Sequence, residues 1–147
     1  MPFQDEPDSI RWRLHLRSPI ARVYQTLSTD EGRASFWAES AVERGGIIHF
    51  VFPNDSTWDA QVIRATPPGY YAVRYFGGSI AAFALEDDGR GGTDLTLTDS
   101  GVLPEYRTEV TAGWVSVLLA LKAAVDFGVD LRAHDPDRNW DHGFVEN

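Results

Sequence analysis

Residues 109–128 read EVTAGWVSVLLALKAAVDFG and form the longest regular pattern in the chain. Apolar side chains recur in this segment at spacings of three and four, the period that places them on one face of an α-helix. Gly128 follows the last periodic residue, and a glycine commonly ends a helix there in the left-handed conformation. The pattern predicts a long helix from about Glu105 to Phe127. Its periodic residues are Val110, Trp114, Val117, Leu121 and Ala124.

Several short strands are predicted upstream of this helix. They are separated by turn-forming glycine pairs such as Gly45-Gly46 and Gly77-Gly78. Short strands joined by short turns are typical of a meandering antiparallel sheet. The predicted strands cover residues 41–44, 47–52, 57–65, 70–76, 80–86 and 93–98.

The N-terminal part predicts one further strand and two short helices. Residues 9–17, SIRWRLHLR, alternate apolar and polar side chains, as expected for a strand with one buried face. Ser18 followed by Pro19 predicts a helix with Ser18 as N-cap and Pro19 in the first helical position. Ser28 and Glu31 have capping-box spacing, which predicts a second helix that runs to about Trp37.

The order of these elements predicts an α+β fold. We expect a curved antiparallel sheet of about seven strands wrapped on the long C-terminal helix, because no other predicted element could cover its apolar face. This is a helix-grip arrangement, with two short helices after the first strand. The length of 147 residues fits a single domain over 1–147, with a core at 9–128 and an acidic C-terminal extension at 129–147.

The composition excludes several classes of function. Lys and Arg number 13 against 22 Asp and Glu, which gives a formal net charge of −9. We therefore expect no nucleic acid partner, because nucleic acid binding needs a basic surface. The chain has no cysteine, which excludes disulfides and thiolate catalysis. The N-terminus has no apolar run, and the apolar stretch from Trp114 to Leu121 is far shorter than the roughly 20 residues of a membrane span. We expect a cytoplasmic protein with no membrane insertion.

Several of these features together resemble a known family. They are the Ser18-Pro19 helix start, Phe36-Trp37 at the end of the second helix, Gly45-Gly46 and Gly91-Gly92-Thr93 before strands, and Gly113-Trp114 in the long helix. Their order and spacing resemble the START-like (Bet v 1-like, SRPBCC) superfamily, and within it the family similar to the C-terminal domain of the activator of Hsp90 ATPase (AHSA1-like). The resemblance covers about residues 9–128 and implies a cavity between sheet and helix. It implies no single activity, because lipid carriers, hormone binders, polyketide cyclases and co-chaperone domains share this scaffold.

Bulky apolar residues predicted to face such a cavity are the candidate ligand-binding residues. Aromatic side chains can line an apolar hollow, but they can equally fill it and make a solid core. The candidates are Trp12, Phe50, Trp58, Tyr71, Tyr75 and Phe83 on the sheet, and Trp37, Val110, Trp114 and Val117 on the helices.

Ionisable residues beside this lining are the candidate acids and bases. Strand alternation turns His49, Asp59 and Arg74 toward solvent. Glu39 lies at the junction of helix and sheet, where alternation does not fix its direction, so we retain it as a candidate ligand-binding or acid–base residue, with Tyr71 as a second candidate acid or base. No nucleophile elbow and no phosphate-binding loop is present. We therefore expect no cofactor, and the catalytic residues stay unassigned.

The tail combines imidazole and carboxylate groups that suit divalent metals. Their spacing matches no known metal site, so we interpret the segment as a hydrated tail and expect no metal. The residues concerned are His134, Asp135, Asp137, Asp141 and His142.

The long helix is apolar nearly all round, which indicates that a second face is covered. Either the tail folds back and covers it with Leu131, Trp140 and Phe144, or a second subunit covers it in a homodimer. The two arrangements are compatible.

The leading hypothesis is binding of a small hydrophobic or aromatic molecule between the sheet and the C-terminal helix, with its physiological identity open. One alternative is a cyclase- or hydrolase-like enzyme that uses the same cavity. The other, implied by the resemblance alone, is an interaction module that regulates the Hsp90 ATPase.

Overall fold

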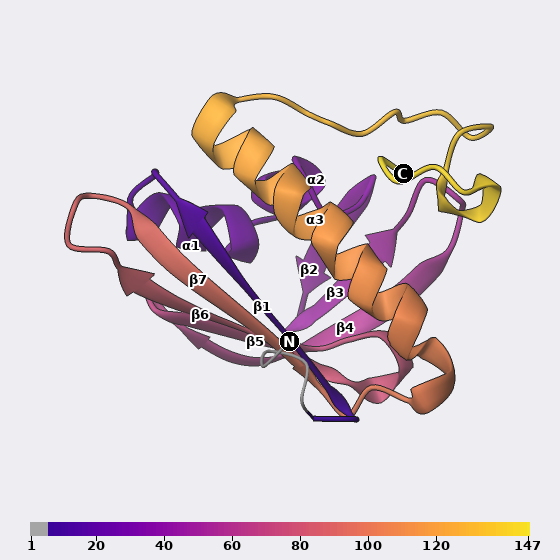
Figure 1. Cartoon of the computed structure of the whole chain (residues 1–147), viewed down its shortest axis with the longest axis horizontal. Coiled ribbons are helices and arrows are strands. Elements are labelled where there is room, and N and C mark those ends of the chain that lie inside the picture. The colour runs from indigo at the N-terminus through magenta and orange to yellow at the C-terminus, as the bar shows by residue number, and fades with distance from the viewer. Residues whose placement is uncertain (1–5) are drawn as a thin grey trace.

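The computed structural model describes residues 6–147, and the predicted helix-grip fold is confirmed (Figure 1). Its strands are β1 (Ser9–Leu16), β2 (Ser40–Arg44), β3 (Ile47–Val51), β4 (Thr57–Thr66), β5 (Tyr70–Arg74), β6 (Ile80–Asp87) and β7 (Thr93–Ser100). Its helices are α1 (Ile20–Ser28), α2 (Asp30–Ala34) and α3 (Arg107–Phe127), with short 3-10 turns η2 (Phe76–Gly78), η3 (Pro104–Tyr106) and η4 (Trp140–His142).

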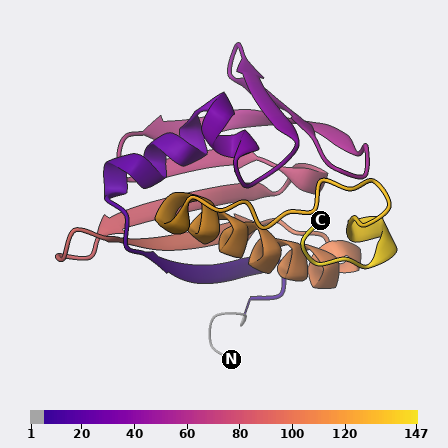
Figure 2. The ribbon, with the colours of Figure 1, turned by 90° about the horizontal axis from the view of Figure 1, so that it is seen from above.

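The strands form one antiparallel sheet in the spatial order β1-β7-β6-β5-β4-β3-β2. The chain therefore runs as a meander from β2 to β7, and β1 joins the sheet beside β7. The long helix α3 crosses the concave face of this sheet. Figure 2 shows that α1 and α2 lie on the same side of the sheet as α3.

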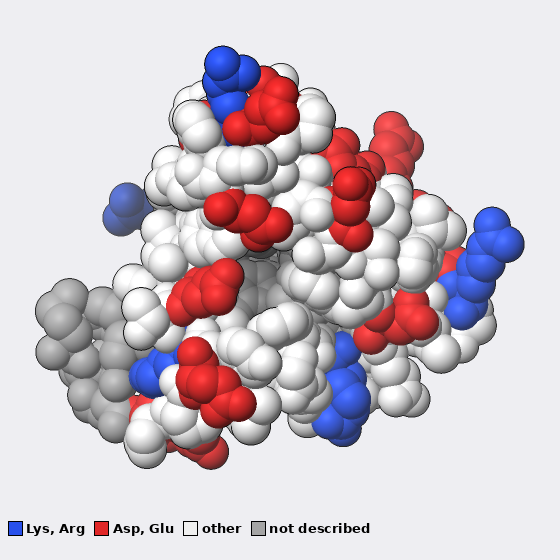
Figure 3. Space-filling model, turned by 90° about the vertical axis from the view of Figure 1, so that its right-hand side faces the viewer, with Lys and Arg blue, Asp and Glu red and all other residues white. Residues whose placement is uncertain are grey.

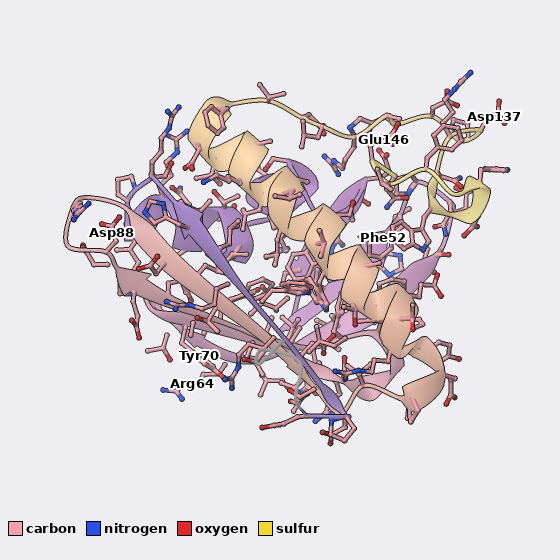
Figure 4. All side chains as sticks on the ribbon, in the orientation of Figure 1. Phe52, Arg64, Tyr70, Asp88, Asp137 and Glu146 are labelled. Carbon is pink, nitrogen blue, oxygen red and sulfur yellow. The ribbon has the colours of Figure 1, made fainter. Side chains whose placement is uncertain are left out.

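Strand alternation places the core on the concave face. On β7, Leu95 and Leu97 are fully buried, and they pair with Leu14 and Trp12 of β1. The outer face is polar, and there Arg64 stacks over the ring of Tyr70 at 5.0 Å, both pointing away from α3 in Figure 4. The amphipathic pattern read from the sequence is therefore the pattern that builds the sheet.

Two predicted helix caps are wrong. Pro19, not Ser18, is the N-cap of α1, because the Pro19 backbone is extended (φ −62°, ψ 150°) and the helix begins only at Ile20. The Ser18 hydroxyl donates to Asp126 Oδ1 at 2.7 Å. The second helix starts later than predicted, at Asp30, and its N-cap is Thr29, whose hydroxyl accepts the Gly32 N–H at 3.0 Å. It ends at Ala34, short of Trp37, and residues 35–37 continue as a turn in which the Trp37 N–H donates to the Arg33 carbonyl at 2.8 Å.

The C-terminal end of α3 is fixed to the start of α1 through Asp126. This carboxylate is buried, and it accepts the backbone N–H groups of Arg17 at 3.0 Å and Ser18 at 3.1 Å. Lys122 Nζ lies 3.3 Å from its second oxygen. In return, the Arg17 guanidinium donates to the Asp126 carbonyl and lies over the Phe127 ring. Gly128 then ends the helix in the predicted left-handed conformation, with φ of 64°.

The segment Pro104–Phe127 is long and apolar enough to cross a membrane by length and composition, although its continuous apolar run, Trp114 to Leu121, is short. This is weak evidence for a span, because the core helix of a soluble protein passes the same test. One face of α3 is buried through Trp114, Leu118 and Leu121, as in a soluble-type domain fold.

Replacement of Asp126 tests the link between α3 and α1. Asp126→Ala removes the acceptor of several buried hydrogen bonds and is expected to lower the free energy of unfolding by about 2–4 kcal/mol. Urea denaturation measures it. The control Glu86→Ala removes an exposed carboxylate from β6 and should change the free energy by less than about 0.5 kcal/mol. Equal stability of the two variants would contradict the role assigned to Asp126.

Candidate functional site

A cavity of about 290 Å³ lies between the first half of α3 and the sheet. Phe52, labelled in Figure 4, lies in its wall behind α3. The remaining lining comes from the β3–β4 turn, the start of β4, the segment between β5 and η2, α3 and the C-terminal tail: Asn54, Ser56, Trp58, Tyr75, Phe76, Glu109, Val110, Gly113, Trp114, Ser116, Val117, Trp140, Asp141 and Asn147.

Aromatic rings in mutual contact form the sheet side of this cavity. The Trp58 ring lies 4.1 Å from Phe52, 5.4 Å from Tyr75 and 5.2 Å from Phe76, measured between ring centroids. Tyr75 in turn lies 5.2 Å from Trp114 of α3. The wall is therefore continuous from the β3–β4 turn to the helix. The indole Nε1 of Trp58 is enclosed and has no hydrogen-bond partner among residues 6–147.

The hydroxyl of Tyr75 is directed into the core. It accepts a hydrogen bond from Trp37 Nε1 at 2.9 Å, and burial raises the pKa of Tyr75 far above its ordinary value. Tyr75 therefore stays neutral at physiological pH. Because its polar atom is turned away, Tyr75 contributes mainly ring surface to the cavity.

A buried carboxylate lies behind the Trp114 ring. Trp114 Nε1 donates to Asp99 Oδ2 at 2.8 Å, and the Asp99 residue is fully buried on the concave face of β7. Burial raises the pKa of Asp99, and hydrogen bonding to Ser79 and then to Trp114 offsets only part of that shift. Sequence reasoning missed Asp99 because the predicted strand ended at Thr98. The alternation Leu95, Leu97, Asp99 was the signal that would have found it.

The C-terminal tail closes one side of the cavity. Trp140 Nε1 donates to Glu109 Oε1 at 2.9 Å, which joins η4 to the first turn of α3. Asn54 Nδ2 donates to Asp141 Oδ1 at 3.0 Å, which joins the β3–β4 turn to the tail. Further along α3, the Ser116 hydroxyl donates to the carbonyl of Val145 in the tail. The tail is therefore part of the site.

Two side chains anchor the start of this tail. Arg132 reaches the segment that connects α2 to β2, where its guanidinium donates to the carbonyls of Ala34 and Ala38 at 2.6 Å each. His134 lies between two carboxylates, 2.6 Å from Asp130 Oδ2 and 2.7 Å from Glu39 Oε1. The hydrogen bond to Asp130 raises the pKa of His134, burial opposes that shift, and Glu39 adds to it.

The structure brings about half of the predicted ligand-binding residues to the cavity. Trp58, Tyr75, Val110, Trp114 and Val117 line it. The others lie elsewhere: Trp37, Phe50 and Phe83 are buried in the core, Tyr71 packs under α1 beside Arg33, Trp12 is half-buried on β1, and Glu39 is exposed and bound to His134. Phe52, Phe76, Gly113 and the tail residues were not predicted.

The ionisable groups that alternation assigned to the outer face do lie there. His49, Asp59 and Arg74 are exposed, and His49 Nδ1 pairs with Asp59 at 2.7 Å. The tail residues with metal-binding side chains are not gathered together: His134 binds Asp130 and Glu39, Asp135 binds Arg138, and His142 binds Asn139. Within residues 6–147, no group of three such ligands could hold a metal ion.

The outer face of α3 carries a second, apolar hollow of about 510 Å³ under the tail. Leu131 and Val145 of the tail line it together with Val115 and Leu119 of α3. The tail folds back over the outer face of α3, as one of the two predicted arrangements requires, but it covers this face only in part. Leu119 remains 51% exposed and Val115 38% exposed.

A family model described as "Activator of Hsp90 ATPase homolog 1-like protein" matches residues 17–126. The chain belongs to this family, as the resemblance of its sequence implied. A search of curated proteins finds no match.

Solved structures share the fold at low sequence identity. The chain is similar to the Aha1 dimer from Colwellia psychrerythraea, with a TM-score of 0.73 and 24% identity over 82% of this chain and 97% of that one. A conserved protein of unknown function from Enterococcus faecalis gives a TM-score of 0.72 and 20% identity over 97% of this chain and 83% of that one. A putative protein of the dynemicin biosynthetic locus gives a TM-score of 0.71 and 17% identity over 84% of this chain and 49% of that one.

Ionisation of Asp99 is expected to make stability fall with pH. Because its pKa is raised above the ordinary 3.8 in the folded chain, the folded state loses stability as pH rises from about 4 through that raised pKa. Asp99→Asn keeps an acceptor for Trp114 but cannot ionise. The variant should therefore become increasingly more stable than wild type as pH rises from about 4 through the raised pKa, measured by urea denaturation. The control Asp94→Asn, on the same strand, should show no such trend. A difference in unfolding free energy between Asp99→Asn and wild type that does not change with pH would contradict the raised pKa of Asp99.

Docking of the tail is expected to weaken at alkaline pH. His134 has a pKa raised above its ordinary 6.5. Its contribution to the stability of the docked tail is therefore complete below about pH 6.5 and is lost as pH rises through the raised pKa. Hydrogen exchange of residues 129–147, corrected for the intrinsic rate, should be slower at about pH 6 than at about pH 9. His134→Gln should abolish this difference. Equal protection of the variant and wild type at the lower pH would refute the role of His134.

Proposed function

We propose that the chain binds a small hydrophobic or aromatic molecule in the cavity between the sheet and α3. The observation that carries this proposal is the continuous aromatic wall around an open volume of about 290 Å³. Ligand sites are commonly apolar concave pockets with few polar groups, and their volumes begin at roughly 300 Å³. The ligand expected here is therefore small, of the size of one substituted ring.

Burial of apolar surface would supply most of the affinity, at roughly 25 cal/mol per Å² removed from water. The enclosed Nε1 of Trp58 lacks an acceptor among the described residues, and an oxygen atom on a bound molecule would satisfy it. Asn54 and Ser56, on the β3–β4 turn, supply further polar groups at the lining. These groups would orient a ligand whose body rests on the rings.

An acid–base enzyme in the same cavity is the second candidate, and Asp99 is the observation that favours it. A carboxyl group with a raised pKa is suited to proton transfer. Asp99 is covered by Trp114, however, so a substrate would reach it only if the Trp114 ring moved. Glu39 is less suitable, because it is exposed and bound to His134 outside the cavity. Binding without chemistry is therefore the better-supported function.

We also propose that the chain forms a homodimer through the outer face of α3. Val115 and Leu119 expose apolar surface there beside the incomplete cover of the tail. A relative with the same fold was solved as a dimer. Analytical ultracentrifugation tests this point, and a species of 16.4 kDa at all concentrations would contradict it.

Gly113 offers a direct test of the proposed ligand site. It lines the cavity in the middle of α3, and a Cβ added there meets no atom within 4 Å. Gly113→Leu would place a side chain in the cavity, and it would also replace a poor helix former by a good one. We expect Gly113→Leu to remain folded but to lose binding of tert-butylbenzene by at least about tenfold, measured by calorimetric titration.

The matched control is Gly113→Ala, which adds one carbon and should retain most of the binding while stabilising the helix by about 0.5–1 kcal/mol. If wild type fails to bind tert-butylbenzene and similar small aromatic molecules, the proposed function is wrong. Undiminished binding by Gly113→Leu would place the ligand elsewhere.

A further inference from the structure

The charged side chains at the cavity are all acidic. Among the lining residues, Glu109 and Asp141 carry charge, and no Lys, Arg or His of residues 6–147 takes part in the lining. Both carboxylates are exposed at the mouth, one on α3 and one on η4. Figure 3 shows this side of the molecule, where the surface is hollowed and mostly Asp and Glu side chains stand around the hollow.

Within the part of the chain that the structure describes, residues 6–147, Glu109 and Asp141 form no ion pair with a Lys, Arg or His. Each accepts one hydrogen bond from a neutral donor, Glu109 from Trp140 and Asp141 from Asn54. The basic residues nearby in the sequence are engaged elsewhere: Arg107 donates to the carbonyls of Pro7 and Ser9, and Arg138 pairs with Asp135. A neutral Gln or Asn side chain could accept the same hydrogen bonds. The need to hold the tail therefore does not explain why Glu109 and Asp141 are negatively charged.

The aromatic wall is shaped like a cage and not like a flat stack. The Trp58 ring is inclined by 78° to Tyr75 and by 51° to Phe76, and Tyr75 is inclined by 38° to Trp114. Trp140 adds an indole from the tail side. Inclined aromatic rings around a small volume attract an organic cation through their quadrupoles, and such cages are used to bind quaternary ammonium groups.

We propose that this cavity takes a small organic cation, namely a quaternary or alkylated ammonium compound with an apolar body. The ammonium group would lie among the rings of Trp58, Tyr75 and Trp114. Glu109 and Asp141 at the mouth would add electrostatic attraction, and the apolar body would occupy the rest of the cavity. This inference rests on the proposed function and specifies the class of ligand. The net charge of −9 works in the same direction, because it raises the local concentration of cations at the surface.

The test compares two probes of the same shape, phenyltrimethylammonium and tert-butylbenzene, which differ by one positive charge. Calorimetric titration of wild type should give at least about tenfold tighter binding of the cation. Raising the salt concentration from about 0.05 M to about 0.5 M should weaken binding of the cation and leave binding of the neutral probe unchanged or slightly stronger.

Charge-removing variants locate the preference. Glu109→Gln and Asp141→Asn keep the acceptors for Trp140 and Asn54, and both positions are exposed, so the fold should be retained. Each variant should weaken binding of the cation by about threefold to tenfold without changing binding of tert-butylbenzene. The control Glu105→Gln makes the same change of net charge at an exposed residue of η3 outside the lining and should have a smaller effect on the cation.

Each result bears on the proposal. Preference for the cation that falls in Glu109→Gln and Asp141→Asn supports it. Equal binding of both probes, or tighter binding of the neutral one, overturns the cationic ligand and leaves the proposed function intact. If neither probe binds, both the cationic ligand and the proposed ligand-binding function are overturned. A preference for the cation that survives in the double variant overturns the role of the two carboxylates.

Discussion

The attachment of α3 to the sheet is the constraint on which the site depends. Asp126 ties the C-terminal end of the helix to Arg17 and Ser18, and the bond from Trp114 to Asp99 ties its middle to β7. Buried carboxylates are costly unless hydrogen-bonded, so both contacts strongly favour one position of the helix. The second half of α3 packs closely through Leu118, Leu121 and Val125, whereas the first half faces the cavity. The absence of a side chain at Gly113 contributes to the open volume there.

The tail closes one side of the cavity that this half of the helix faces. Family membership rests on residues 17–126, so the tail lies outside the shared pattern. It nevertheless supplies Trp140 and Asp141 to the lining, and it is anchored by Arg132 and His134 far from η4. A chain with the same core and a different tail would present a wider and differently charged mouth. The fold is thus shared while this part of the cavity lining is local, as expected when one scaffold serves many functions.

Much of the fold could be predicted from the sequence, because local periodicity reports it directly. The alternation in residues 9–17 and the helical period ending at Gly128 were sufficient to predict β1 and α3. The site was harder, because its parts are brought together by contacts over 87 and 31 residues, between Asn54 and Asp141 and between Glu109 and Trp140. No local pattern encodes such pairs. Ser18 illustrates the same limit. Its sequence has the form of an N-cap, but the extended Pro19 backbone delays the helix by one residue, and the Ser18 N–H and hydroxyl bind the distant Asp126.

The five tryptophans allow the central claim, a ligand cavity under the first half of α3, to be tested by one measurement. Trp58, Trp114 and Trp140 line the cavity from three different elements, whereas Trp12 lies on β1 outside the lining. In a titration with phenyltrimethylammonium followed by ¹H–¹⁵N NMR, the indole N–H signals of the three lining tryptophans should shift together with one dissociation constant, while that of Trp12 stays in place. Shifts confined to Trp140, or the absence of any saturable shift at Trp58 and Trp114, would contradict the account.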